Sequence, residues 1–235
     1  MVLIPTYNSG EKLAATFEAA RSVWPHVWVV VDGSTDGSAD SLAERPEARI
    51  IRRPRNGGKG AAVLDGLREA VRARFTHVLV MDADGQHPAE EIPRFMALAR
   101  ARPDAMILGV PRFEAGAPRA RVWGRRISNV IARFLAGGRI GDALFGFRVY
   151  PARPLLRVME AGPGMRGYDF DAEAVVRLTW AGVPVLNQPA AVRYFSRQEG
   201  GTSHFRYGRD NLLLAGMYAR LFFAWSRQRF TPSRH

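Results

Sequence analysis

Short apolar runs alternate with amphipathic stretches in the first half of the chain, and this alternation limits the possible folds more than any other feature. The run VWVVV at 27–31 is continuous and β-branched, which is typical of a strand buried on both faces. Alternating strands and helices form βαβ units, so the sequence predicts an α/β fold with a Rossmann-like, mostly parallel sheet flanked by helices. We expect strands at 2–4, 27–31, 48–52, 77–81 and 105–110, and helices at 10–22, 34–44, 58–73 and 88–101.

The second half is less regular, and no low-complexity linker separates it from the first. A strand is expected at 145–151, and an extended segment or a strand pair at 184–195. Helices are expected at 120–136, 171–182 and 209–229.

Basic residues are concentrated in the second half. The net charge is +12; residues 1–110 carry 14 basic and 14 acidic side chains, so the whole excess lies in 111–235. Such an excess suits a polyanion, an anionic membrane surface or a phosphorylated substrate. Nucleic acid is not an expected partner, because aromatic residues are not interleaved with the arginines and no helix-turn-helix signature is present. The chain has no cysteine, which permits a reducing compartment, and no apolar run reaches the ~18 residues of a membrane span.

Polar residues follow three of the expected strands: Pro5-Thr6-Tyr7-Asn8, Asp32-Gly33-Ser34 and Asp82-Ala83-Asp84. The carboxyl ends of parallel strands meet at one edge of a sheet, where ligands bind. Any one of the three segments could be an ordinary turn, but together they predict a binding pocket.

The two aspartates at 82 and 84 suggest a metal site. Mg²⁺ or Mn²⁺ takes oxygen ligands, and Gln86 adds a neutral oxygen nearby. The usual phosphate-binding loops are absent, because Lys59 precedes Gly60 rather than Ser or Thr, and DGSTDG does not match GxGxxG. The sequence therefore favours a nucleotide held mainly through a cation.

Four segments resemble family 2 glycosyltransferases in order and spacing: IPTYN, VVVDGSTDGS, NGGKGAAVLDGL and DADGQHP. The set is most similar to the dolichol-phosphate mannose synthase branch, which shares N-x-GKG-x-A, DAD-x-QHP and the later GFR. The resemblance implies a GT-A fold over 1–208, with a nucleotide-sugar half at 1–110 and an acceptor half at 111–208. Residues 209–235 would add an amphipathic helix and a tail.

The resemblance also implies donor-site roles. Asp32 would accept a hydrogen bond from the base, although Val31 stands where the family usually has another aspartate. Lys59 would lie near the donor, unless it is a solvated loop lysine. The residues implied in nucleotide-sugar binding are Pro5, Thr6, Tyr7, Asn8, Asp32, Lys59, Asp82, Ala83 and Asp84, and those implied in binding Mg²⁺ or Mn²⁺ are Asp82, Asp84 and Gln86.

Arginines in the second half suggest an acceptor phosphate. Arg112 follows a strand, and Arg125 lies one helical turn before Ser128. Arginines and a hydroxyl can clamp a phosphate, and the branch uses Arg and Ser in this region. Arg126 is the alternative to Arg125, and both arginines could instead be solvated. Arg148 belongs to the GFR signature and completes the predicted acceptor-phosphate set.

Two carboxylates are candidates for the reaction centre. The resemblance implies Asp142, and Asp171 matches the branch's FD-x-E, although it could instead cap the following helix. A sugar hydroxyl needs a general base, whereas a phosphate acceptor is already anionic and needs only groups that orient it. Ser203, His204 and Arg206 could close over the donor diphosphate.

The last helix has an arginine stripe and an otherwise apolar surface. Arg209, Arg220 and Arg227 fall within about 20° of one another on a helical wheel. This pattern is expected of an interfacial helix on a membrane, and a core helix of a homodimer would give it too.

The sequence therefore predicts an inverting, metal-dependent glycosyltransferase, cytoplasmic and peripheral at the inner face of the membrane. It would move a sugar from GDP-mannose or a UDP-hexose to a polyprenyl phosphate or related lipid. One alternative is transfer to a sugar hydroxyl in glycolipid or polysaccharide assembly. Another is a sugar-phosphate nucleotidyltransferase, which would need a Gly-rich loop that IPTYNSG does not supply.

Overall fold

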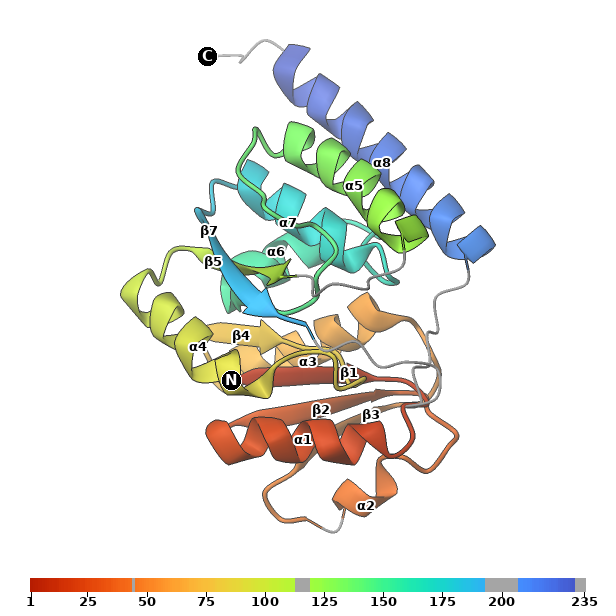
Figure 1. Cartoon of the computed structure of the whole chain (residues 1–235), viewed down its shortest axis with the longest axis vertical. Coiled ribbons are helices and arrows are strands. Elements are labelled where there is room, and N and C mark those ends of the chain that lie inside the picture. The colour runs from red at the N-terminus through yellow and green to blue at the C-terminus, as the bar shows by residue number, and fades with distance from the viewer. Residues whose placement is uncertain (44, 113–118, 193–206, 231–235) are drawn as a thin grey trace.

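A computed structural model describes residues 1–43, 45–112, 119–192 and 207–230. They contain a seven-stranded sheet in the order β3-β2-β1-β4-β6-β5-β7 (Figure 1). β6 runs antiparallel to both of its neighbours, and the other four pairs are parallel, which confirms the predicted mostly parallel sheet. The strands are β1 (Val2–Thr6), β2 (Val27–Asp32), β3 (Arg49–Arg53), β4 (His77–Val80), β5 (Met106–Arg112), β6 (Arg148–Pro151) and β7 (Val185–Ala191).

Helices flank this sheet, and most lie within one or two residues of their predicted positions. They are α1 (Lys12–Val23), α2 (Asp40–Ala43), α3 (Lys59–Arg72), the 3₁₀ turn η1 (Ala89–Glu91), α4 (Ile92–Ala101), α5 (Arg119–Leu135), α6 (Ala152–Glu160), α7 (Phe170–Trp180) and α8 (Tyr207–Phe230).

The second half agrees with the prediction in one place and departs from it in another. Of the range 184–195, residues 193–195 lie outside the described part of the chain, and Val185–Ala191 form the single strand β7, which pairs in parallel with β5. This agrees with the predicted extended segment, and the alternative of a strand pair does not form within the described residues. Helix α6 was not predicted, because Pro154 interrupts its pattern. Pro154 lies in the first helical turn, where a missing N–H costs no intrahelical bond, and Leu155 and Met159 are buried four residues apart.

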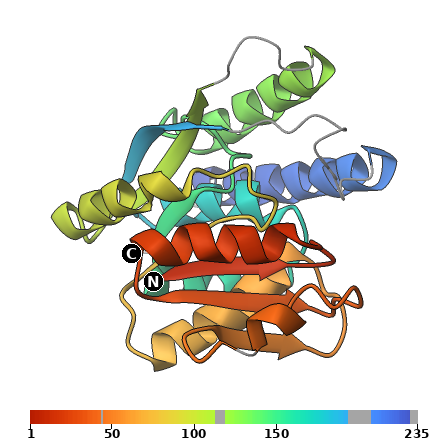
Figure 2. The same cartoon turned by 60° about the horizontal axis from the view of Figure 1, so that its bottom comes forward.

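The central strands are buried on both faces of the sheet, because successive side chains of each strand point to opposite sides and helices cover both. In β1, Leu3 packs in a cluster with Leu67 of α3, whereas Ile4 packs in another with Phe17 of α1. All four side chains are fully buried. Figure 2 shows α1 and α3 on opposite faces of the sheet.

The C-terminal helix α8 lies beside α5 and also contacts α7 (Figure 1). Met217 and Leu221 are fully buried in the same cluster as α3 and α7, and the Tyr218 hydroxyl donates to the Ser128 carbonyl at 3.0 Å. The predicted C-terminal helix is thus present and packed. Within the described ranges, no helix combines the length and hydropathy that crossing a bilayer requires.

The arginine stripe predicted on this helix is partly engaged by the protein. Arg220 Nη2 lies 3.2 Å from Glu173 Oε2, and the Glu173 side chain is fully buried on α7 and also accepts from Arg177 Nε at 2.7 Å. Arg220 therefore anchors α8 to α7. The side chain of Arg209 lies outside the part of the chain that the structure describes.

Candidate active site

The loops after β1 and β2 are joined at the carboxyl edge of the sheet, as predicted. The Asn8 side chain accepts from Thr35 N–H at 2.9 Å, and Ser34 Oγ accepts from Asn8 N–H at 3.0 Å. Pro5 and Thr6 end β1, and the neighbouring Tyr7 side chain is 38% exposed. The segment predicted to line the nucleoside pocket is therefore hydrogen-bonded to the β2 loop and forms one continuous edge with it.

Asp32 has a second role that the sequence did not indicate. Its side chain is 3% exposed and accepts from the backbone N–H groups of Gly57 at 3.0 Å and Gly58 at 2.7 Å, as well as from Arg53. Asp32 therefore holds the loop that leads into α3. Contact between Asp32 and a base stays a prediction.

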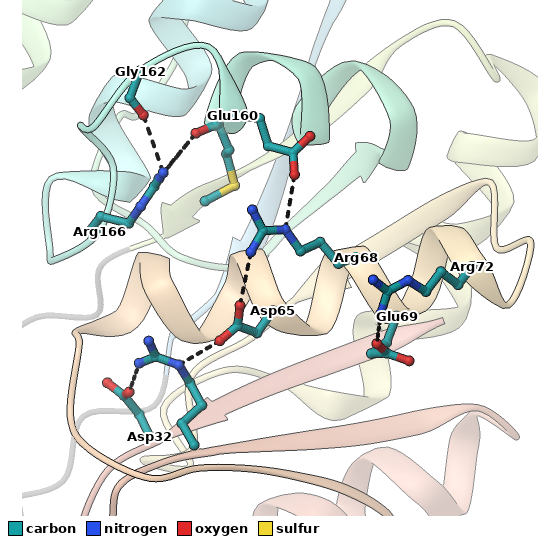
Figure 3. A network of polar contacts seen from close by, with 10 residues as sticks. Asp32, Asp65, Arg68, Glu69, Arg72, Glu160, Gly162 and Arg166 are labelled. Atoms are coloured by element: carbon teal, nitrogen blue, oxygen red, sulfur yellow. Dashed lines mark hydrogen bonds and ion pairs between the residues drawn. The ribbon is translucent and has the colours of Figure 1, made fainter.

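This contact belongs to a longer polar network shown in Figure 3. Arg53 Nε also donates to Asp65 at 2.7 Å, and Arg68 links Asp65 on α3 to Glu160 at the end of α6, at 3.4 and 3.0 Å. The network fixes the outer side of α3, whose first residue is Lys59.

Lys59 lies between two carboxylates of the predicted site. Its Nζ is 2.6 Å from Asp82 Oδ1 and 2.7 Å from Asp171 Oδ2, and its side chain is 11% exposed. Burial alone would lower the pKa of Lys59, but the charges of Asp171 and Asp82 outweigh it and raise the pKa above its ordinary value. A solvated loop lysine is therefore excluded.

Gly146 makes this arrangement possible. A Cβ at this position would lie 2.6 Å from Lys59 Nζ and 2.9 Å from Asp82 Oδ2. The glycine of the GFR signature therefore leaves space for the ammonium and the carboxylate.

Gly146→Ala is expected to disturb the site while leaving the fold nearly intact, because the crowded atoms are the ends of side chains. Stability should change by less than about 1 kcal/mol, and Mn²⁺–nucleotide affinity should fall about tenfold or more. Thermal unfolding and calorimetric titration would measure the two effects. Gly162→Ala is the control, because its Cβ meets nothing within 4 Å. Equal nucleotide affinity in the two variants would contradict this role for Gly146.

The DADGQHP segment holds its aspartates through local hydrogen bonds. Asp82 N–H donates to His87 Nδ1 at 2.9 Å, and Gln86 N–H donates to Asp84 Oδ1 at 2.9 Å. Burial lowers the pKa of His87 below its ordinary value. Because Nδ1 accepts the Asp82 N–H, the ring proton lies on Nε2, 3.7 Å from Asp82 Oδ2. His87 therefore positions Asp82, a role that its place in the DADGQHP motif does not by itself indicate.

The donor set fits a hard cation that shares its coordination with a substrate. Asp82 and Asp84 offer carboxylate oxygens, with Ala83 buried between them and Gln86 close by. Among the described residues, no group of three or more Asp, Glu, His or Cys side chains gathers around one point. Two carboxylates are too few for an all-protein cage, but they suit Mg²⁺ or Mn²⁺ completed by phosphate oxygens and water.

Asp142 is saturated with hydrogen bonds. Arg125 donates to both carboxylate oxygens, at 2.7 and 2.8 Å, Asn129 donates at 2.8 Å, and the N–H groups of Leu144 and Phe145 donate at 2.8 and 2.7 Å. Burial would raise the pKa of Asp142, but these bonds and the charge of Arg125 hold it below its ordinary value. Such a carboxylate is a poor proton acceptor, so its geometry suits orientation of Arg125 rather than general-base chemistry.

Asp171 faces the site rather than capping a helix. The residue before α7 is Asp169, and Asp171 lies inside the first turn with Oδ2 on Lys59. Its buried Oδ1 has no hydrogen-bond partner within the described residues and lies 4.0 Å from Arg148 Nη1.

Arg148 departs from the predicted acceptor-phosphate role. Its side chain is completely buried in β6, donates to the Asp142 carbonyl at 3.3 Å and to the Tyr150 hydroxyl at 3.1 Å, and also donates to the Asp171 carbonyl. A guanidinium with no exposed surface cannot contact an incoming phosphate in this conformation. Arg148 instead ties together the segments that carry the two candidate carboxylates.

The other acceptor residues lie at different places. Arg125 and Ser128 are half-buried on α5, and Arg112 is exposed at the end of β5. Arg125 thus links α5 to Asp142. Arg148 in turn contacts the carbonyls of Asp142 and Asp171, and the Asp171 side chain pairs with Lys59. Ser203, His204 and Arg206 lie outside the described residues.

Comparison with known proteins identifies the family of this site. Residues 1–161 match the model of glycosyl transferase family 2. The chain belongs to this family. The glycosyltransferase is 31% identical over 214 residues to the polyprenol monophosphomannose synthase of Mycolicibacterium smegmatis, covering 86% of this chain and 79% of that protein. It is 28% identical over 210 residues to the undecaprenyl-phosphate mannosyltransferase of Micrococcus luteus, covering 85% of each.

Solved structures confirm the fold of the glycosyltransferase. Glucosyl-3-phosphoglycerate synthase from Mycobacterium tuberculosis in complex with UDP superposes with a TM-score of 0.69 at 15% identity, covering 94% of this chain and 78% of that one. The same enzyme with Mn²⁺, UDP and phosphoglyceric acid gives 0.64 at 16% identity, covering 97% and 77%. The predicted family, branch and GT-A fold are confirmed, and the nucleotidyltransferase alternative is set aside.

Proposed function

We propose that this glycosyltransferase moves a sugar from a nucleotide-diphosphate sugar to a polyprenyl phosphate or a related lipid phosphate, with inversion at the anomeric carbon. One observation carries the choice of acceptor. The two candidate bases, Asp142 and Asp171, are each paired with a cation, Arg125 at 2.7 Å and Lys59 at 2.7 Å. A phosphate acceptor is already anionic and needs no base, whereas a sugar hydroxyl does.

The proposed reaction is a single displacement. An oxygen of the acceptor phosphate forms a bond to the anomeric carbon as the bond from that carbon to the donor diphosphate breaks. The nucleoside diphosphate leaves with the electron pair, and attack from the opposite face inverts the carbon. Arg125 would hold the attacking phosphate because Asp142 fixes its guanidinium, with Ser128 and Arg112 as further predicted contacts.

A divalent cation completes the proposal. Asp82 and Asp84, with Gln86 beside them, would hold Mg²⁺ or Mn²⁺. The bound ion would offset the diphosphate charge and make it a better leaving group. The complexes of the M. tuberculosis synthase with Mn²⁺ and UDP support this choice.

A thermal-shift screen tests the donor half of the proposal. GDP-mannose, UDP-glucose and UDP-N-acetylglucosamine would each be added with Mn²⁺. A ligand at about 100 times its Kd stabilises the folded state by about 2.7 kcal/mol, so at least one should raise the melting temperature by several degrees. No stabilisation by any of them would contradict the proposed donor class.

We also propose that the enzyme docks on the cytoplasmic face of the membrane through an outer apolar strip on α5 and α8. On α5, Ile127, Val130 and Phe134 fall within about 60° on a helical wheel. Ring contacts from Phe134 to Trp225 (5.2 Å) and from Trp225 to Phe222 (5.7 Å) join the two helices. The strip consists of Ile127, Val130, Phe134, Leu212, Phe222 and Phe223, each more than half exposed.

The charged residues beside this strip support a lipid surface as its binding partner. Arginines flank it on both helices, at Arg126, Arg133 and Arg227, whereas Arg220 is held by Glu173 of α7. An apolar face edged by arginines suits insertion below anionic headgroups. The opposite side of α5 carries Arg125, so one helix would join the lipid surface to the acceptor phosphate.

Vesicle binding tests the strip. Combining Ile127→Glu with Phe223→Glu is expected to weaken binding to phosphatidylglycerol vesicles at least about tenfold, because two apolar contacts are lost and negative charge is added. Sedimentation with vesicles would measure it. Val23→Glu on α1, 36% exposed in the wild type, is the matched control. Unchanged binding would contradict membrane docking. A lipid-free dimer that the double variant dissociates would assign the strip to a second copy instead.

A further inference from the structure

The Lys59 ammonium is the counter-ion of two carboxylates, Asp82 and Asp171. Its ammonium lies within 2.7 Å of an oxygen of Asp82 and an oxygen of Asp171, which are 89 residues apart in the sequence and come from different elements. Gly146 closes the third side, since its Cβ position is 2.6 Å from Nζ. The positive charge therefore sits directly on a carboxylate proposed to bind the divalent cation.

The backbone of Lys59 is fixed, while its side chain has room to adjust. Gly58 N–H donates to Asp32 at 2.7 Å, and the N–H groups of Gly60 and Ala61 donate to the carbonyls of Gly167 and Arg166 at 3.3 and 2.9 Å. These bonds hold the first turn of α3 from two sides. A lysine carries its charge on a flexible four-carbon stem, so the ammonium can leave Asp82 without moving the helix.

We propose that Lys59 competes with the divalent cation for Asp82, so that the cation binds tightly only together with the donor diphosphate. The inference rests on the proposed function. With Lys59 on Asp82, an incoming cation meets a positive charge and only part of the carboxylate charge. The diphosphate brings enough negative charge to offset both cations, and Asp171 keeps a partner for Lys59 when it leaves Asp82. Lys59 is thus a positioning residue that couples cation binding to donor binding.

A Mn²⁺ titration without nucleotide tests this coupling directly. Lys59→Met keeps the length of the stem and removes the charge. This variant is expected to bind Mn²⁺ about tenfold more tightly than the wild type. The electron spin resonance signal of free Mn²⁺ would measure the binding. The gain in Mn²⁺ affinity on adding GDP or UDP should shrink correspondingly. A residue that only supports the structure would give the opposite sign, because its loss loosens the carboxylates.

The chain offers a matched control, since Lys12 and Lys59 are its two lysines. Lys12→Met makes the same charge change on α1 and should leave the affinity for Mn²⁺ unchanged. Lys59→Gln retains N–H donors for both carboxylates and replaces Lys59→Met if that variant does not fold. One outcome would overturn this inference but not the proposed function: the wild type binds Mn²⁺ only in the presence of nucleotide, and the folded Lys59 variant binds Mn²⁺ no more tightly than the wild type. No Mn²⁺ binding by the wild type even with GDP or UDP would overturn the metal-dependent function itself.

Discussion

Asp82→Asn is expected to lower sugar transfer by about a thousandfold or more. A cation that stabilises a leaving diphosphate contributes several kcal/mol to the transition state, and each 1.36 kcal/mol is a factor of ten in rate. Asn keeps the shape of the side chain but removes the charge that the cation needs. The fold should persist, because Lys59 retains Asp171 at 2.7 Å. Initial rates at saturating donor and acceptor, together with Mn²⁺ affinity in the presence of nucleotide, would measure the effect.

Asp104→Asn is the control for this substitution. Asp104 is more than half exposed and pairs with Arg102 at 3.4 Å, a surface ion pair worth little. Its loss should leave both transfer and Mn²⁺ binding at the wild-type level. If Asp82→Asn retained more than a tenth of the wild-type rate, Asp82 would not be a ligand of the essential cation.

Asp142→Asn is expected to have the largest effect on stability, about 3 kcal/mol, together with weaker acceptor binding. The carboxylate accepts five hydrogen bonds and pairs with the largely buried Arg125. In the variant, an amide N–H₂ group replaces one acceptor oxygen, and the guanidinium loses its buried partner. Arg125 would then lose its fixed orientation, so KM for the acceptor should rise more than kcat falls.

The split between KM and kcat distinguishes the two roles considered for Asp142. A general base would give a large fall in kcat, an unchanged KM for the acceptor and the loss of one arm of the pH–rate profile. Denaturant unfolding would measure the stability change, and Asp104→Asn should alter it by less than about 0.5 kcal/mol. A fully stable Asp142→Asn variant with normal acceptor KM would contradict the positioning role.

Strands β1, β2, β4 and β5 were predictable because each lies in a largely apolar run, whereas β3 has arginines at three of its five positions. β2 is buried along its whole length, so its sequence carries almost no polar residue before Asp32. The polar segments after β1, β2 and β4 were also predictable, since each begins where an apolar run stops.

Contacts between distant residues could not be predicted in the same way. Lys59 and Asp171 are 112 residues apart, and nothing local to either indicates that they meet at 2.7 Å. Arg148 was predicted to contact the acceptor phosphate, but as the first residue of β6 it is fully buried beneath neighbouring elements and has no exposed surface. Asp32 was predicted to meet a base, and its bonds to Gly57 and Gly58 depend on where the following loop folds back.

Helix α8 is a further case in which local sequence does not indicate the contacts between distant residues. The wheel of its sequence predicted an arginine stripe opposite an apolar surface. In the structure, Met217 and Leu221 turn inward and Arg220 pairs with the buried Glu173 of α7. The apolar residues therefore divide between the core and the outer strip, a division that the helix alone cannot specify.

The most direct test of the proposed function compares two acceptors that differ only in the phosphate. A radiolabelled sugar nucleotide found in the thermal-shift screen would be incubated with Mn²⁺ and either a polyprenyl phosphate or the corresponding polyprenol, in the same detergent. We expect labelled lipid only with the phosphate, because the site offers Arg125 to a phosphate and holds Asp142 and Asp171 in ion pairs. Labelled lipid from the polyprenol, with none from the polyprenyl phosphate, would contradict the proposed function.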